Sequence, residues 1–318
     1  MENILVVLPV DQRHRDKLEA AAPGQRFIYT CGAEPTEEQI LAADIIIGNV
    51  PAGPLAASDR LKWLQLNSAG ADAYIQPGVL RPGVILTNAS GAYGKAVSEH
   101  AFAMTLMLMK KLHLYRDAQK QDCWSDFGTV SSMTDATVLV VGLGDIGLRY
   151  ARMAKALGAY VIGVKRRAGV CPEGVDELYT TEALFDLLPR ADVIMSILPG
   201  SAGTYHMYTA AYFDRMKESA IFINCGRGGV VDGGVLYDAL RQGKIAAAGI
   251  DVTEPEPLPE DSPLWQLDNL MITPHVSGFY HLPETFERVV DIAAENLSIY
   301  FAGGTVQNIV DFETGYRR

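Results

Sequence analysis

The stretch TVLVVGLGDIG, residues 137–147, decides the fold class of this 318-residue chain. Its first half is a valine-rich run, which is typical of a strand buried inside a parallel sheet. Its second half has the pattern G-x-G-x-x-G and opens a helical stretch that ends near Leu157. A strand, a glycine turn and a helix in this order predict a dinucleotide-binding unit, whereas the hexamer alone would be weak support.

The glycines of this turn each have a physical task. Gly142 allows the tight turn, Gly144 lets the backbone approach a pyrophosphate, and Gly147 lets the helix pack closely on the strand. The amide N–H groups of Asp145 and Ile146, at the start of the helix, would then face the phosphates. A glycine-rich turn that serves packing alone is the simpler alternative.

Short apolar runs alternate with helical patterns on both sides of this stretch. Strands are expected at residues 4–8, 27–29, 44–48, 61–66, 84–87, 137–142, 160–164, 192–198, 220–224, 245–252 and 270–273. Thr36 and Gln39 fit a capping box, and residues 99–120, which lack Gly and Pro, predict one long helix that bridges two domains. The alternation predicts an α/β protein with two doubly wound parallel sheets.

The end of the strand at residues 160–164 bears on the choice of dinucleotide. An NAD site usually carries Asp or Glu about 20 residues after the glycine turn, where it binds the ribose 2′-OH. This chain has Lys165, Arg166 and Arg167 there and no carboxylate. Because such cations can pair with a 2′-phosphate, the sequence predicts a preference for NADP(H), with NAD(H) possible. A solvated basic loop is the alternative.

Three segments after predicted strands carry the rarer residue types. They are INCGRGGVVD with Arg227, DVTEPEPLP with Glu256, and TPHVSG with His275. Since ligands bind beyond the carboxyl ends of strands in doubly wound sheets, these side chains are expected to converge. Taken singly, each residue has a simpler interpretation: Arg227 as part of a surface ion pair, Glu256 as a solvated carboxylate, and His275 as a structural histidine. Glu254 lies two residues from Glu256 and competes with it for the same role.

Together with GLGDIG, these segments resemble the D-isomer-specific 2-hydroxyacid dehydrogenase family. The resemblance covers almost the whole chain and is strongest at residues 137–278. It implies two Rossmann-like domains, with a dinucleotide-binding domain at 99–287 inserted into a flavodoxin-like substrate domain at 1–98 and 288–318. It also implies hydride transfer from NADPH to a small 2-keto acid.

The family resemblance also assigns roles to individual residues. Arg227 would bind the substrate carboxylate, and His275, paired with Glu256, would give a proton to the carbonyl oxygen. The backbone of Ala69 and Gly70 would bind the other side of the substrate. The expected cofactor-binding residues are Gly142, Gly144, Asp145, Ile146, Gly147, Lys165, Arg166, Arg167, Leu198, Pro199, Thr204, Cys225, Asp251, His275 and Gly278.

Composition argues against several other classes of protein. The 38 acidic and 27 basic residues give a formal net charge of −11, which disfavours sequence-independent binding to nucleic acid or to anionic membranes. The four scattered cysteines form no CxxC pair, so we expect no metal site and a reduced, cytoplasmic protein. The N-terminus does not look like a signal peptide, and the apolar run at 101–109 is too short to cross a bilayer.

Two further expectations come from the resemblance. A symmetric homodimer through the dinucleotide-binding domain is the expected assembly. The competing function is a dinucleotide-sensing interaction protein, similar to the C-terminal-binding protein corepressors, which share this fold and keep similar catalytic residues.

Overall fold

The structure is a computed structural model that describes residues 1–313. The chain divides into two compact units, which are described one at a time: Met1–Tyr93 with Tyr280–Arg318 form unit 1, and Gly94–Phe279 form unit 2. The sequence placed these boundaries at 98/99 and 287/288. The observed boundaries lie earlier because helix α4 begins at Gly94 and helix α10 at Pro283, so each helix belongs wholly to one unit.

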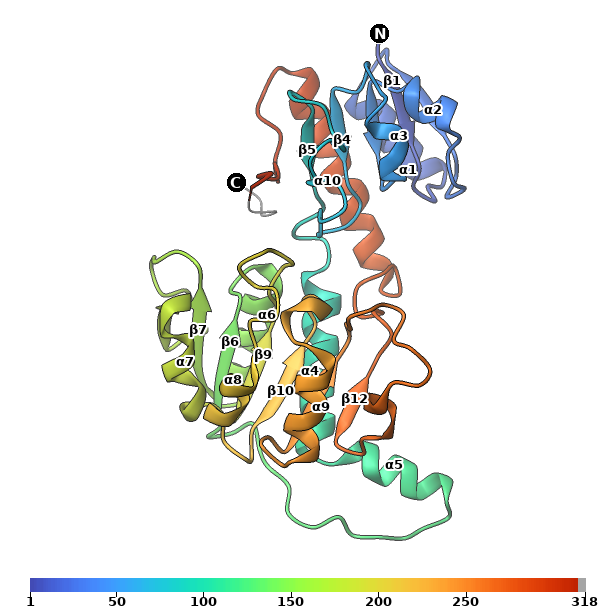
Figure 1. The fold of residues 1–318 in the computed structure, drawn as a ribbon. Helices are drawn as coiled ribbons and strands as arrows, with labels where there is room; N and C mark the ends of the chain where they lie inside the picture. Colours follow the sequence, from blue (N-terminus) through green and yellow to red (C-terminus); the bar gives the residue numbers. More distant parts are fainter. Residues whose placement is uncertain (314–318) are drawn as a thin grey trace. The chain divides into compact units, whose positions relative to one another are not determined.

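Unit 2 is built on a parallel sheet of seven strands in the order β12-β11-β10-β9-β6-β7-β8. Most strand residues are buried, because helices cover both faces (Figure 1). Helices α4 and α6 pack together on one face, and α7, α8 and α9 lie on the other. The strands are β6 Thr137–Val141, β7 Tyr160–Lys165, β8 Glu177–Thr180, β9 Val193–Ser196, β10 Ile221–Asn224, β11 Ala247–Ile250 and β12 Leu270–Ile272.

The helices of unit 2 follow the alternation that the sequence predicted. They are α4 Gly94–Met109, α5 Leu112–Lys120, α6 Asp145–Ala156, α7 Leu184–Leu187, α8 Ala210–Arg215 and α9 Gly233–Arg241. Short 3-10 turns lie at η1 Thr181–Ala183, η2 Leu188–Arg190, η3 Gly228–Val230 and η4 Pro263–Gln266. Since all seven strands run parallel, the loops that follow them meet at one edge of the sheet.

Unit 1 has a parallel five-stranded sheet in the order β2-β1-β3-β4-β5, the flavodoxin-like arrangement. Alternate side chains of β1 serve opposite faces: Ile4 and Val6 pack with α1 and α10, while Leu5 packs with α2 and α3. The elements are β1 Asn3–Val6, α1 Gln12–Ala21, β2 Arg26–Tyr29, α2 Glu37–Leu41, β3 Ile45–Ile47, α3 Ala52–Leu55, β4 Trp63–Gln65, β5 Ile85–Thr87 and α10 Pro283–Phe301.

Among the other local features, the predicted capping box was confirmed, one predicted helix was wrong, and one strand was not predicted. The capping box forms, with Thr36 accepting from the Gln39 amide and Gln39 accepting from the Thr36 amide. The single helix at 99–120 was wrong, because Lys111 takes a left-handed conformation with φ of 54° that separates α4 from α5. Strand β8 was not predicted; it is a half-buried edge strand with the sequence ELYT, which lacks a continuous apolar run.

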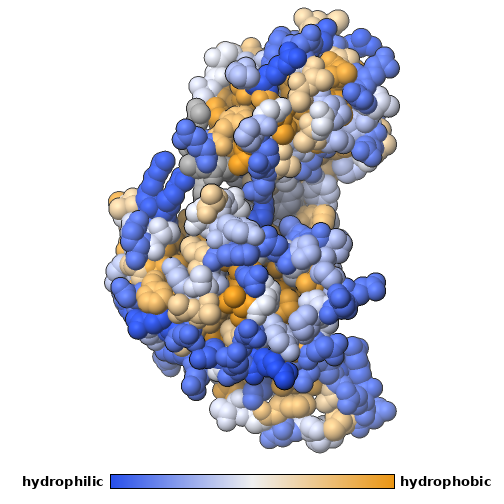
Figure 2. All heavy atoms as spheres, viewed as in Figure 1, coloured by the Kyte–Doolittle hydropathy of each residue, from blue (hydrophilic) through white to orange (hydrophobic). Residues whose placement is uncertain are grey.

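The surface of each unit is mostly polar, as the many charged residues of the sequence lead one to expect. Hydrophilic residues cover much of the visible surface of each unit in Figure 2, interrupted by smaller hydrophobic patches. Within residues 1–313, none of the helices combines the length and the apolar character that a membrane span requires. The same residues contain no His, Cys, Asp and Glu cluster suited to a metal ion.

Candidate active site

The glycine turn after β6 has the shape that phosphate binding needs. Gly142 has a φ of 106°, and a Cβ there would lie 2.7 Å from the Ile197 carbonyl oxygen. A Cβ on Gly147 would overlap the Gly142 carbonyl. At Gly144 a Cβ would meet no described atom within 4 Å. Packing therefore requires two of the glycines, and the third faces open space where a phosphate can approach.

Helix α6 begins directly after this turn, with Gly144 as its N-cap and Asp145 and Ile146 as its first residues. The backbone N–H groups of this first turn have no partners within the helix, so they are suited to an anion. The carboxylate of Asp145 accepts a bond of 2.9 Å from Arg149, one turn later. This ion pair reduces the repulsion that a bare carboxylate would exert on a phosphate at the same place.

The three cations that follow β7 lie at the same edge of the sheet. Lys165 is the last residue of β7, and Arg166 and Arg167 are exposed in the loop beyond it. β7 is the neighbour of β6, the strand that leads into the glycine turn. The structure therefore places positive charge beyond the carboxyl end of the strand next to the phosphate turn.

Arg227 lies in a tightly held loop after β10. The Asn224 side chain donates to the Arg227 carbonyl at 3.0 Å and accepts from the Gly226 amide at 3.1 Å. A Cβ on Gly226 would overlap the Leu198 carbonyl, and one on Gly228 would overlap the Thr253 carbonyl. The loop that carries Arg227 thus packs against the loops that follow β9 and β11.

Glu256 and His275 form a hydrogen-bonded pair. The distance from His275 Nδ1 to Glu256 Oε2 is 2.8 Å, and the other carboxylate oxygen accepts from the Thr253 amide at 3.0 Å. Because an ionised carboxylate only accepts hydrogen bonds, Nδ1 carries the hydrogen and Glu256 orients the ring. The two side chains are 38% and 47% exposed, so the pair is accessible to a ligand.

Asp251 holds the segment that carries His275. Its carboxylate is buried and accepts from the Thr273 hydroxyl at 2.5 Å, the Val276 amide at 2.9 Å and the Ser277 amide at 3.1 Å. The Asp251 carbonyl also accepts from the His275 amide at 2.7 Å. The sequence placed Asp251 among the expected cofactor-binding residues. These bonds give it the additional task of fixing the His275 loop.

His100 and Thr273 join this network and were missed in the sequence. His100 Nε2 lies 3.0 Å from the Thr273 hydroxyl and 3.8 Å from an Asp251 oxygen. His100 comes from α4, more than 150 positions before its partners, so no local pattern could connect them.

The remaining cofactor candidates line the same edge. Leu198 is buried, and the Pro199 carbonyl accepts from the Thr204 hydroxyl at 2.7 Å in the loop after β9. Burial raises the pKa of the Cys225 thiol, which opposes a thiolate role for this residue and favours a packing role. Gly278 directly follows Ser277, whose amide is bonded to Asp251.

A cavity of about 380 Å³ lies beside the His275–Glu256 pair. Its other walls are mainly apolar and include Leu258, Trp265 and Ile272. Sequence reasoning did not identify these wall residues, because they look like ordinary core positions.

In unit 1, Ala69 and Gly70 lie in the loop after β4. The Ala69 carbonyl accepts from the Asn88 side chain at 2.7 Å, and the Gly70 carbonyl accepts from Ser68 Oγ at 2.7 Å. Asn67, at the start of the loop, donates to the Tyr280 hydroxyl at 2.7 Å and accepts from the Tyr93 hydroxyl. These bonds fix the backbone of Ala69 and Gly70.

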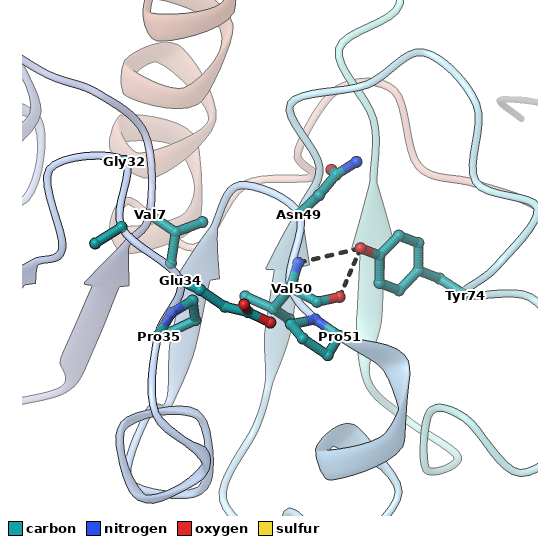
Figure 3. Close-up of a pocket in the computed structure, with 9 residues that line it drawn as sticks. Val7, Gly32, Glu34, Pro35, Asn49, Val50, Pro51 and Tyr74 are labelled. Atoms are coloured by element: carbon teal, nitrogen blue, oxygen red, sulfur yellow. Dashed lines mark hydrogen bonds between the residues drawn. The ribbon is translucent and has the colours of Figure 1, made fainter. Parts of the chain in front are cut away.

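Unit 1 also has a cavity of about 310 Å³ at the carboxyl ends of β1, β2 and β3 (Figure 3). The Tyr74 hydroxyl closes one side by bonding the Val50 backbone, at 3.1 Å to the amide and 2.8 Å to the carbonyl. Ala69 and Gly70 are not among its lining residues, which are Val7, Gly32, Ala33, Glu34, Pro35, Asn49, Val50, Pro51 and Tyr74.

Known proteins share both the sequence pattern and the fold. Residues 102–277 match the family model for the NAD binding domain of D-isomer specific 2-hydroxyacid dehydrogenases. Over 303 residues the chain is 30% identical to glyoxylate reductase from Korarchaeum cryptofilum, covering 93% of this chain and 88% of that protein.

Two solved structures are similar over nearly the full chain. A D-isomer specific 2-hydroxyacid dehydrogenase family protein from Aeromonas salmonicida is 35% identical with a TM-score of 0.85, covering 98% of this chain and 99% of that one. The NADPH-dependent glyoxylate/hydroxypyruvate reductase from Sinorhizobium meliloti, in complex with NADP and sulfate, is 26% identical. Its TM-score is 0.83, with 99% of this chain and 100% of that one covered.

Proposed function

Because the chain belongs to the D-isomer-specific 2-hydroxyacid dehydrogenase family, we propose that it reduces a small 2-keto acid to the 2-hydroxy acid with NADPH. One observation carries the proposal: the His275–Glu256 pair and Arg227 follow neighbouring strands of the sheet that also bears the glycine turn. The chain therefore brings a histidine–carboxylate pair, an arginine and a glycine turn to one edge of the sheet, which supports the roles proposed for them.

In the proposed reaction, Arg227 binds the substrate carboxylate and polarises the adjacent carbonyl. A nicotinamide cofactor, when bound, would supply the hydride that the carbonyl carbon accepts. His275, oriented through Nδ1 by Glu256, gives a proton from Nε2 to the carbonyl oxygen as negative charge develops there. The same imidazole acts as the base in the reverse direction. Ala69 and Gly70 are assigned to substrate binding.

The residues present fit a dinucleotide. Gly142, Gly144 and Gly147 with the first residues of α6 would hold the pyrophosphate. Lys165, Arg166 and Arg167 would pair with a 2′-phosphate, which supports NADPH over NADH. The solved relative from Sinorhizobium meliloti, which is NADPH-dependent and bound to NADP, adds support. Leu198, Pro199, Thr204, Asp251 and Gly278 are assigned to the rest of the cofactor.

A panel of 2-keto acids assayed with both reduced cofactors tests this proposal. We expect turnover of small members such as glyoxylate or hydroxypyruvate, with kcat/KM about 10-fold or more higher for NADPH than for NADH. Reversing the charge in the variant Arg166→Glu/Arg167→Glu should reduce or invert that ratio. The matched control Arg241→Glu, on α9, should leave it unchanged.

Turnover with equal or better use of NADH would contradict the NADP preference alone. Tight cofactor binding without turnover of any keto acid would contradict the enzyme proposal and favour the partner-binding alternative. The relatives named above give that alternative no support.

We also propose that two copies pair through α5 and the segment after it. This part of unit 2 extends away from the sheet (Figure 1) and exposes Leu112 at 51%, Val130 at 46% and Trp124 completely. Apolar side chains gathered on one exposed segment are typical of an interface.

The variant Trp124→Glu is expected to convert a dimer to a monomer, which light scattering after size-exclusion chromatography would measure. Val170→Glu is the matched control, because Val170 is also apolar and 90% exposed but lies outside this segment. A wild-type chain that elutes as a monomer would refute the dimer.

A further inference from the structure

Unit 2 contains a second histidine–carboxylate pair, formed by residues that matched no catalytic pattern in the sequence. His206 Nε2 lies 2.7 Å from Glu254 Oε2, with side chains 36% and 39% exposed. His206 comes from the loop after β9, and Glu254 comes from the loop after β11. The two glutamates of this loop therefore have different partners: Glu254 bonds His206, and Glu256 bonds His275.

This pair encloses Gly229, two residues after Arg227. The His206 amide donates to the Gly229 carbonyl at 2.7 Å, with His206 held at a left-handed φ of 48°. The Tyr205 ring stacks on the His206 imidazole, with centroids 3.9 Å apart and planes 17° apart. A Cβ on Gly229 would lie 3.3 Å from Tyr205 and 3.4 Å from Glu254 Oε1.

The pair therefore joins the two loops that flank the Arg227 loop. The Arg227 loop also packs directly against both of these loops. A Cβ on Gly228 would overlap the Thr253 carbonyl, and a Cβ on Gly226 would overlap the Leu198 carbonyl. The His206–Glu254 bond links those neighbours to each other. Because the His206 backbone also bonds the Gly229 carbonyl, the same residue connects the Arg227 loop to both neighbouring loops.

We propose that His206 and Glu254 are positioning residues that hold the Arg227 loop for binding the substrate carboxylate. This inference rests on the proposed function. The bond from His206 also engages a carboxylate that lies close to Gly229, two residues after Arg227. Exposed ion pairs contribute little to global stability, so the variants should fold. Small displacements of a binding group nevertheless weaken its interaction with the ligand.

Variants of His206 separate its hydrogen bond from its ring stacking. His206→Phe keeps a ring on Tyr205 and loses the bond to Glu254, whereas His206→Gln keeps a donor. We expect KM for the 2-keto acid to rise about fivefold in His206→Phe and less in His206→Gln. The values of kcat and the affinity for NADPH should stay within about twofold. Asp214→Asn is the control, because it removes a similarly exposed ion pair with Lys244 at 2.9 Å.

Amide hydrogen exchange gives a readout that does not depend on turnover. With NADPH bound, exchange at residues 228–231 is expected to be about fivefold faster in His206→Phe than in the wild type or in Asp214→Asn. Unchanged exchange would overturn the proposal, and so would faster exchange without a rise in KM. A parallel loss of kcat, cofactor affinity and melting temperature would also overturn it, as a general structural effect. Absence of turnover in the wild type would refute the proposed function. The exchange data would still test whether the His206–Glu254 bond holds the Arg227 loop.

Discussion

Replacing His275 by glutamine is expected to lower kcat for 2-keto acid reduction by about 10²- to 10⁴-fold, the usual contribution of a general acid. Glutamine can still bond Glu256, but it cannot give up a proton to the developing alkoxide. The affinity for NADPH, measured by fluorescence titration, should change little. A kcat within threefold of the wild type would remove His275 from the mechanism.

His113→Gln is the matched control for this experiment. His113 lies in unit 2 on α5, which follows the end of α4 remote from the glycine turn. Its substitution should leave kcat unchanged.

The fold was largely predictable, because its main signals are local. The valine run with the glycine turn and the Thr36–Gln39 capping box were confirmed, as each rests on neighbouring residues. The break at Lys111 was not predictable, because a left-handed lysine has no compositional mark. Strand β8 was missed for a related reason: an edge strand such as ELYT is stabilised by its neighbour and not by an apolar run of its own.

The candidate site was predictable in its residue types but not in all its pairings. Arg227, Glu256 and His275 were predicted from their place after strands and from the family resemblance, and the loops that carry them do follow neighbouring strands of one parallel sheet. The choice of Glu256 over Glu254 rested on the family resemblance alone. The separate partners of the two carboxylates, His206 for Glu254 and His275 for Glu256, could not be predicted because the histidines come from two other loops. The three bonds that Asp251 accepts also depend on the path of the His275 loop, which sequence spacing does not describe.

Replacing Arg227 by glutamine is expected to lower kcat/KM for the 2-keto acid by about 10³-fold, because removing one partner of a charge pair costs about 2–5 kcal/mol. Arg227→Lys should recover only part of this loss, since lysine keeps the charge but lacks the planar fork that matches a carboxylate. Steady-state kinetics with a single keto acid would measure both effects.

The effect of Arg227 should be confined to the substrate. NADPH binding should be preserved in both variants, because the glycine turn and the Lys165 strand end come from different strands than Arg227. Arg241→Gln, an exposed arginine on α9, serves as the control and should retain full kcat/KM. If Arg227→Gln lowered kcat/KM for an uncharged carbonyl compound by the same factor, relative to the wild type, as for the keto acid, the loss would not come from the carboxylate. Arg227 would then act on the carbonyl or on the loop geometry alone, and its assignment as the carboxylate anchor would fail.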